Sequence, residues 1–130
     1  MTDQDTVRAV LGLSTWAVVG LRENPARPAY GVARFLQDRG KRIVPVHQQP
    51  QDVFGEVGYP RLADVPIPVD VVDVFVNSTR CGAVADEAVE IGAKAVWFQL
   101  GVVDEEAAER VRAAGLLMVM DRCPAIEWGR

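Results

Sequence analysis

Cysteine, histidine and long uncharged runs are scarce in this chain of 130 residues. Its two cysteines, Cys81 and Cys123, are too few and too far apart for a disulfide framework or a zinc site. An apolar run such as residues 95–103 falls far short of the roughly 20 residues that cross a bilayer. The acidic N-terminus lacks the basic-then-apolar pattern of a signal peptide. We therefore expect a cytoplasmic protein without a membrane partner.

Positive charge is not in excess either. The formal net charge is −4 and the isoelectric point is near 4.9, which argues against a nucleic-acid partner. Residues 1–42 nevertheless carry +3, so the rest of the chain carries −7. Most of the basic residues are arginines, whose planar guanidinium suits bidentate contacts with phosphate. The composition, 49% hydrophobic and 25% charged, is typical of one globular domain spanning residues 1–130.

Short apolar runs alternate with helical patterns along the chain. These runs predict buried strands at residues 16–20, 42–46, 69–76, 95–99 and 116–120. Helical spacing and capping residues predict helices at 6–11, at 29–38, from Ser78 or Thr79 to Ile91, and from Asp104 to about 114. Between them, residues 47–68 have a weak pattern, for which we expect a helical turn at 52–54, a marginal edge strand at 57–59 and a turn at 62–65.

This alternation predicts an α/β fold: a three-layer, Rossmann-like, doubly wound parallel sheet of five to six strands. Ligands bind such sheets at the carboxyl ends of the strands, near the point where the strand order reverses. The candidate binding residues at those ends are Gly20, Leu21, Arg22, Val46, His47, Phe75, Val76, Asn77, Gln99 and Gly101, with Arg27 and Tyr30 in the first strand–helix connection.

The usual nucleotide motifs are absent. No G-x-G-x-x-G follows Gly20, and His47 stands where a dinucleotide-binding sheet usually has an acid. The phosphate-loop pattern also fails, because Gly40-Lys41 is followed by Arg42. These departures weigh against NAD as the ligand and against ATP or GTP hydrolysis.

Catalytic and metal-binding patterns are lacking too. His47 is the only histidine, and no nucleophile elbow is present. Asp70 and Asp73 lie three apart on a predicted strand and so face opposite sides. We expect no catalytic residue and no metal site. Cys81, in the first turn of its helix, is expected to have a lowered pKa and to react faster than Cys123 under the C-terminal tail.

A resemblance to a known family extends from about residue 5 to the end. The segments that carry it are residues 17–21, 24–30, 43–46, 71–75, 92–101 and 120–123, with Glu127. They resemble the small stand-alone CoA-binding proteins and the N-terminal CoA-binding domain of the succinyl-CoA synthetase α subunit. The chain departs from that family's pattern at Val46-His47-Gln48, at Phe75-Val76-Asn77 and at Ala29. The resemblance implies coenzyme A as the bound cofactor, held by the candidate residues named above.

Our leading hypothesis is non-catalytic binding of CoA or an acyl-CoA. In it Arg22 and Arg27 contact phosphates, Val46 and Phe75 flank the adenine, and residues 99–101 face the pantetheine arm. The alternative is an NADP- or CoA-dependent enzyme subunit whose catalytic machinery is on a partner. A third hypothesis is a purely structural subunit, with Trp128 at the interface with a protein partner or with a second copy of the chain.

Overall fold

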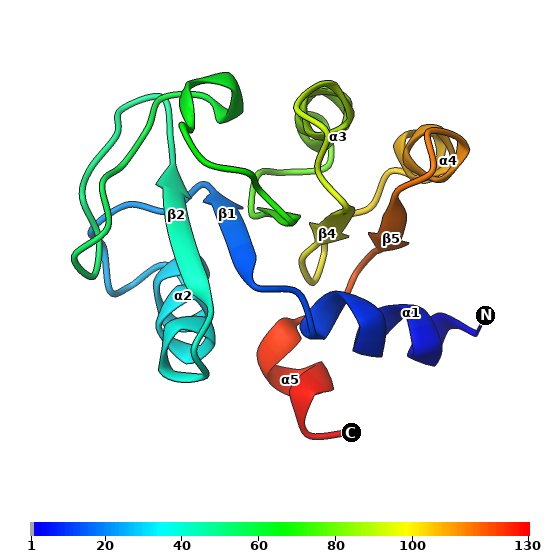
Figure 1. Ribbon diagram of the computed structural model, residues 1–130, viewed down its shortest axis with the longest axis horizontal. Coiled ribbons are helices and arrows are strands. Elements are labelled where there is room, and N and C mark those ends of the chain that lie inside the picture. Colours follow the sequence, from blue (N-terminus) through cyan, green and yellow to red (C-terminus); the bar gives the residue numbers. More distant parts are fainter. Residues whose placement is uncertain (1) are drawn as a thin grey trace.

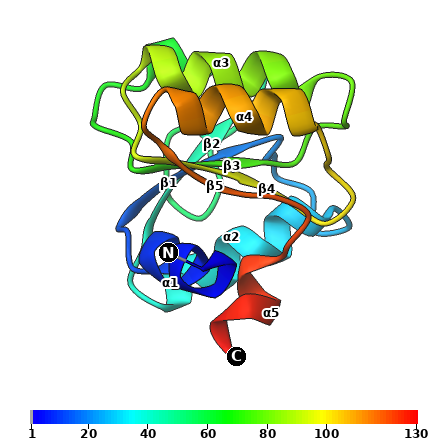
Figure 2. The ribbon, with the colours of Figure 1, turned by 90° about the vertical axis from the view of Figure 1, so that its right-hand side faces the viewer.

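The computed structural model describes residues 2–130 as a parallel sheet with helices on both faces (Figures 1 and 2). Its strands are β1 (Thr15–Val19), β2 (Arg42–Val46), β3 (Val71–Val74), β4 (Ala95–Phe98) and β5 (Leu117–Val119). Its helices are α1 (Asp3–Leu11), α2 (Pro28–Asp38), α3 (Cys81–Glu90), α4 (Glu105–Ala113) and α5 (Pro124–Trp128), with one 3-10 turn, η1 (Leu62–Asp64). Among residues 2–130, no helix combines the length and the apolar character that crossing a membrane requires.

The predicted α/β Rossmann-like fold is confirmed. The five strands are all parallel, in the order β2-β1-β3-β4-β5, so the strand order reverses between β1 and β3. Figure 2 shows α3 and α4 on one face of the sheet, and α1, α2 and α5 on the other. Pro45, which has no N–H to donate, lies on the edge strand β2.

Alternate residues of the strands feed two separate cores. On the α3/α4 face, strand residues such as Val72 and Phe98 pack against the small side chains of Ala85 and Ala108, which allow the helices to approach closely. On the opposite face, Trp16 and Trp97 lie with their ring centroids 5.7 Å apart. Their indole N–H groups donate to the carbonyl oxygens of Leu13 (2.9 Å) and Arg122 (2.8 Å), so neither buried donor is left unpaired.

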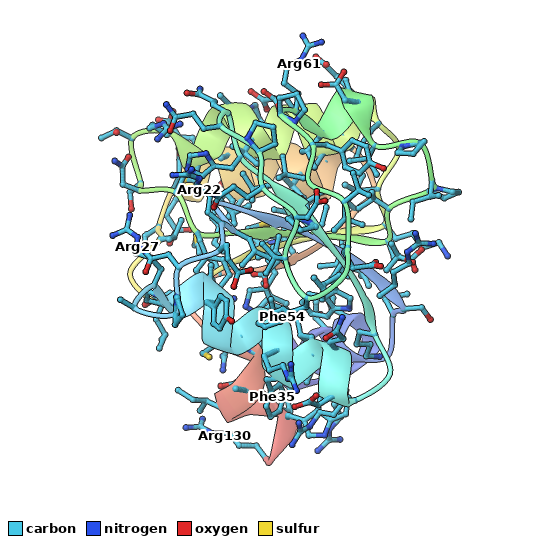
Figure 3. All side chains as sticks on the ribbon, turned by 90° about the vertical axis from the view of Figure 1, so that its left-hand side faces the viewer. Arg22, Arg27, Phe35, Phe54, Arg61 and Arg130 are labelled. Carbon is cyan, nitrogen blue, oxygen red and sulfur yellow. The ribbon has the colours of Figure 1, made fainter. Side chains whose placement is uncertain are left out.

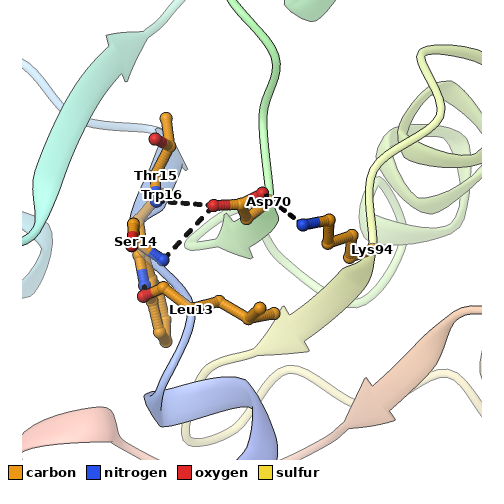
Figure 4. Close-up of polar contacts among 6 residues, drawn as sticks. All are labelled: Leu13, Ser14, Thr15, Trp16, Asp70 and Lys94. Atoms are coloured by element: carbon orange, nitrogen blue, oxygen red, sulfur yellow. Dashed lines mark hydrogen bonds and ion pairs between the residues drawn. The ribbon is translucent and has the colours of Figure 1, made fainter.

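Asp70 ties the amino ends of three strands together (Figure 4). Its Oδ2 accepts hydrogen bonds from the N–H groups of Ser14 (3.3 Å) and Thr15 (3.0 Å), and Lys94 Nζ lies 3.4 Å from Oδ1. Partial burial acts to raise the pKa of Asp70, but the Thr15 N–H and the Lys94 ammonium outweigh it and lower the pKa. Asp70 and Asp73 have separate partners, because Asp73 is bonded to Gln99 instead.

Several predicted elements differ in the structure. α1 begins at Asp3 rather than at residue 6, because Thr2 and Asp5 form a capping box. The helical turn expected at 52–54 is wrong: Val53 and Glu56 pair around a tight turn in which Phe54 has a φ of 52° and Gly55 a φ of 80°.

Two other segments differ between the sequence prediction and the structure. The edge strand expected at 57–59 is reduced to a single bridge between Tyr59 and Val46, whereas the turn at 62–65 is present as η1. The C-terminal tail forms α5, which no capping pattern had suggested; Pro124 begins it without a side-chain cap.

Candidate functional site

A cleft of about 380 Å³ opens where β1 and β2 end. It lies beside the reversal of strand order, where ligands bind doubly wound sheets. Its lining residues are Gly20, Arg22, Glu23, Asn24, Arg27, His47 and Gln51. A smaller hollow of about 240 Å³ between α1 and β5 is lined by acidic, basic and apolar side chains, without a cluster of one charge. We therefore place the candidate site in the larger cleft.

Gly20 allows the chain to leave β1 close to the end of β3. Its φ of +108° belongs to the left-handed region that favours glycine, and its N–H donates to the carbonyl of Val46 at 2.8 Å. A Cβ at this position would lie 3.2 Å from the Cβ of Phe75. A side chain at residue 20 would therefore strain the turn and crowd the floor of the cleft.

The N-terminus of α2 meets the cleft at Arg27. Arg27 is the N-cap residue and makes no side-chain capping bond, Pro28 occupies the first helical position, and the first turn holds no acid. Neither the N-cap side chain nor the first turn therefore places a negative charge at the positive end of the helix dipole, as suits an anion. Asn24 braces the preceding loop, since its Oδ1 accepts from the N–H of Ala26 at 3.1 Å.

His47 lies near three arginines, two from the loop between β1 and α2 and one from the segment before α3. Burial lowers its pKa, and the charges of Arg22, Arg80 and Arg27 lower it further, so the ring is neutral near pH 7. Its Nδ1 accepts from the N–H of Gln49 at 3.0 Å. A neutral imidazole that accepts at Nδ1 carries its proton on Nε2, so His47 presents an uncharged N–H donor.

The arginines around His47 outnumber the single carboxylate, Glu23, in the lining of the cleft. Within residues 2–130, Arg22, Arg27 and Arg80 take part in no ion pair. The Nε atom of Arg22 is buried and has no hydrogen-bond partner in this part of the chain. A buried charged donor without a partner is costly, and an anion in the cleft would relieve that cost. Figure 3 shows Arg22 and Arg27 on the same edge of the molecule.

Four of the predicted residues line the cleft: Gly20, Arg22, Arg27 and His47. The side chains of two others do not reach it. Leu21 is fully buried in the α1/α2 core and Val46 is buried in the α3/α4 core, so only their backbone atoms are available to a ligand.

The remaining candidates have partners within the protein. Tyr30 packs against Phe54 with the rings tilted and a centroid distance of 4.5 Å, and its hydroxyl lies 3.3 Å from Glu23 Oε1. Phe75 and Val76 are half-buried against the two opposite cores. Asn77 Oδ1 accepts from both the N–H and the hydroxyl of Thr79.

Gln99 and Gly101 are likewise engaged. Gln99 Nε2 donates to Asp73 Oδ1 at 2.6 Å inside the protein, and the Gly101 N–H donates to Asp121 Oδ1 at 2.8 Å. Their side of the sheet therefore offers a ligand mainly backbone atoms and neighbouring side chains, rather than the amide of Gln99.

The structure also brings in residues that sequence reasoning missed: Glu23, Asn24, Gln51 and Arg80. Asn24 belongs to residues 24–30, one of the segments that carry the family resemblance. Gln51 comes from the weakly patterned stretch after β2 and reaches back, its Oε1 accepting from the Glu23 N–H at 2.9 Å. Arg80 precedes α3, and only the pairing of β1 with β3 brings it near His47.

The prediction of a reactive Cys81 is wrong in its physical basis. Cys81 does begin α3, but its side chain is fully buried, and its Sγ lies 3.5 Å from the carbonyl of Ser78. Burial raises the pKa of the thiol, and the negative charge of Asp104 raises it further, so the thiolate is disfavoured rather than favoured. Cys123 is only half-buried.

Comparisons with known proteins agree with this architecture. YneT, an uncharacterized protein of Bacillus subtilis (strain 168), is 36% identical over 107 residues, which cover 82% of this chain and 79% of that protein. A hypothetical protein from Pyrococcus horikoshii OT3 superposes with a TM-score of 0.92 at 33% identity, over 100% of this chain and 92% of that one.

A larger protein contains the same fold. The dinucleotide-forming acetyl-coenzyme A synthetase 1 of Ca. Korarchaeum cryptofilum superposes with a TM-score of 0.76 over 88% of this chain and 28% of that one. At 23% identity this likeness concerns the fold alone. The family model described as "CoA binding domain" matches residues 14–129, nearly the whole chain. The protein therefore belongs to the CoA binding domain family.

Proposed function

We propose that the cleft at the ends of β1 and β2 binds the phosphate-bearing half of coenzyme A or an acyl-CoA, and that the protein does not transform this ligand. The observation that carries the proposal is the excess of positive charge at the cleft: Arg22, Arg27 and Arg80 act on His47, and none of them takes part in an ion pair within residues 2–130. CoA carries a diphosphate and a 3′-phosphate, so it brings more negative charge than NAD.

The chain offers two kinds of donor to these phosphates. The uncapped start of α2 and the guanidinium groups of Arg22 and Arg27 suit the diphosphate, as charged forks and helix N-termini do elsewhere. His47 adds a neutral N–H donor from the end of β2. The cleft volume of about 380 Å³ is within the range of small-molecule sites.

Affinity for CoA is expected to depend on its 3′-phosphate. Loss of one charge-assisted contact costs about 1.5–3 kcal/mol, so 3′-dephospho-CoA should bind roughly ten- to a hundredfold more weakly than CoA. Calorimetry at one fixed salt concentration, with CoA, dephospho-CoA, NADP and NAD, measures this directly. Equal affinities for CoA and dephospho-CoA would remove the 3′-phosphate from the proposal. Tighter binding of NADP than of CoA would favour the alternative of an NADP-dependent subunit.

The geometry around His47 supports binding without turnover. Its one accepting ring nitrogen is occupied by the Gln49 N–H, and its neighbours are arginines rather than a nucleophile, so it is poorly placed to remove a proton. We expect no hydrolysis of acetyl-CoA or butyryl-CoA above the buffer rate, as followed by release of free thiol. Thiol release that disappears in a His47→Gln variant, while that variant still binds CoA, would instead assign an enzymatic role.

A further inference from the structure

We propose that the loop between β4 and α4, residues 99–104, seats the acyl group of the ligand, and that this ligand is a CoA thioester with a short, uncharged, apolar acyl chain. The inference rests on the CoA-binding proposal and narrows it to one class of thioester. It starts from two apolar side chains that the fold leaves in solvent: Leu100 is 57% exposed and Val103 is 43% exposed.

The backbone of this loop is held by hydrogen bonds from two neighbouring loops. The Ser78 hydroxyl, from the segment after β3, donates to the carbonyl of Gly101 at 3.3 Å and accepts from the N–H of Val103 at 3.0 Å. The carboxylate of Asp121, after β5, accepts from the Gly101 N–H at 2.8 Å. Leu100 and Val103 are therefore presented by a braced backbone, which is what a preorganised contact requires.

A continuous row of contacts joins this loop to the phosphate cleft. Gly20 at the end of β1 lies against Phe75 at the end of β3, and Ser78, three residues further on, bonds to Gly101 and Val103. One strand, β3, separates β1 from β4. Neighbouring strands are about 4.8 Å apart, so the ends of β1 and β2 lie roughly 10 to 15 Å from the end of β4, a span that an extended pantetheine arm covers.

The charges around the loop restrict the acyl group. Asp121 supports Gly101 from one side, and Asp104 follows Val103 as the N-cap of α4, with Glu105 and Glu106 in its first turn. The same two aspartates each accept one backbone N–H at Oδ1, and their negative charge repels a carboxylate. The loop therefore suits an aliphatic acyl chain, and it disfavours an acyl group that ends in a carboxylate.

Calorimetry with CoA, butyryl-CoA and succinyl-CoA at one salt concentration tests the proposal. Burying two or three methylene-sized groups against Leu100 and Val103 should make butyryl-CoA bind roughly tenfold more tightly than CoA. Succinyl-CoA should bind no more tightly than CoA. In a Leu100→Ser, Val103→Thr double variant the preference for butyryl-CoA over CoA should disappear.

Ile126→Ser is the matched control, because Ile126 is 48% exposed on α5, in the helix layer away from α3 and α4. This variant should keep the tenfold preference. Equal affinities of the parent for CoA and butyryl-CoA, or a preference that survives in the double variant, would overturn the acyl assignment and leave CoA binding intact. Failure of CoA itself to bind would instead contradict the proposed function.

Discussion

The free energy of unfolding of an Asp73→Asn variant, taken relative to that of the parent, is expected to rise by about 4 kcal/mol between pH 4 and pH 8. Asp73 is fully buried in β3, and burial raises its pKa from 3.8 to about 7, against a lesser effect of the Gln99 hydrogen bond. Its Oδ2 finds no partner within residues 2–130, so the ionised form is poorly accommodated.

The sign follows from proton binding. Between pH 4 and pH 7 the folded protein retains the Asp73 proton while the unfolded chain loses it, so the parent's free energy of unfolding falls with rising pH and levels off above 7. Asparagine stays neutral throughout and keeps an oxygen that can accept from Gln99 Nε2. Its stability relative to the parent therefore rises over this range.

Urea unfolding of both proteins at several pH values between 4 and 8 measures this difference directly. Asp70→Asn is the matched control: the pKa of Asp70 is lowered from 3.8 in the folded state, so its effect has the opposite sign and lies at lower pH, and this variant should keep the parent's pH dependence between pH 5 and pH 8. Parallel stability profiles for the parent and the Asp73→Asn variant would contradict a raised pKa at Asp73.

Loss of CoA affinity in an Arg22→Ala, Arg27→Ala double variant is the second large effect. Each guanidinium is expected to make a charge-assisted contact with phosphate worth about 1.5–3 kcal/mol, and Arg27→Ala alone should show a loss in that range. The two side chains share one cleft, so the loss in the double variant need not be the sum of the single losses. It should still exceed either one.

The double variant also has a readout that needs no ligand. Removing two of the arginine charges that act on His47 should raise the pKa of its imidazole, which NMR titration of this single histidine reports. Arg34→Ala is the control, because Arg34 lies on α2 outside the cleft and pairs with Asp38 at 3.2 Å. Unchanged CoA affinity in the double variant, together with an unchanged pKa of His47, would show that the phosphate cleft is misassigned.

The parallel α/β fold was predictable from local patterns, because each strand is a short apolar run closed by glycine or polar residues, and each helix has a recognisable stop. The same holds for Gly20, Arg22, Arg27 and His47. Gly20, Arg22 and His47 lie at or just after the ends of the first two strands, Arg27 lies at the start of the helix that follows β1, and parallel strands bring their carboxyl ends to one edge of the sheet. A site built from such positions can be predicted from strand ends alone.

Only the tertiary structure decided which side chains face solvent, and with what charge around them. Leu21 and Val46 are sequence neighbours of cleft residues, but their side chains pack into the two cores. Two residues from distant segments reach the cleft instead: Gln51 bonds to the N–H of Glu23, and the charge of Arg80 acts on His47. The pKa of a group such as Cys81 or Asp73 depends on burial and on neighbouring charges, which residue spacing along the chain does not specify. The sequence by itself therefore determined the sheet and the location of the cleft, and long-range packing determined the electrostatics within it.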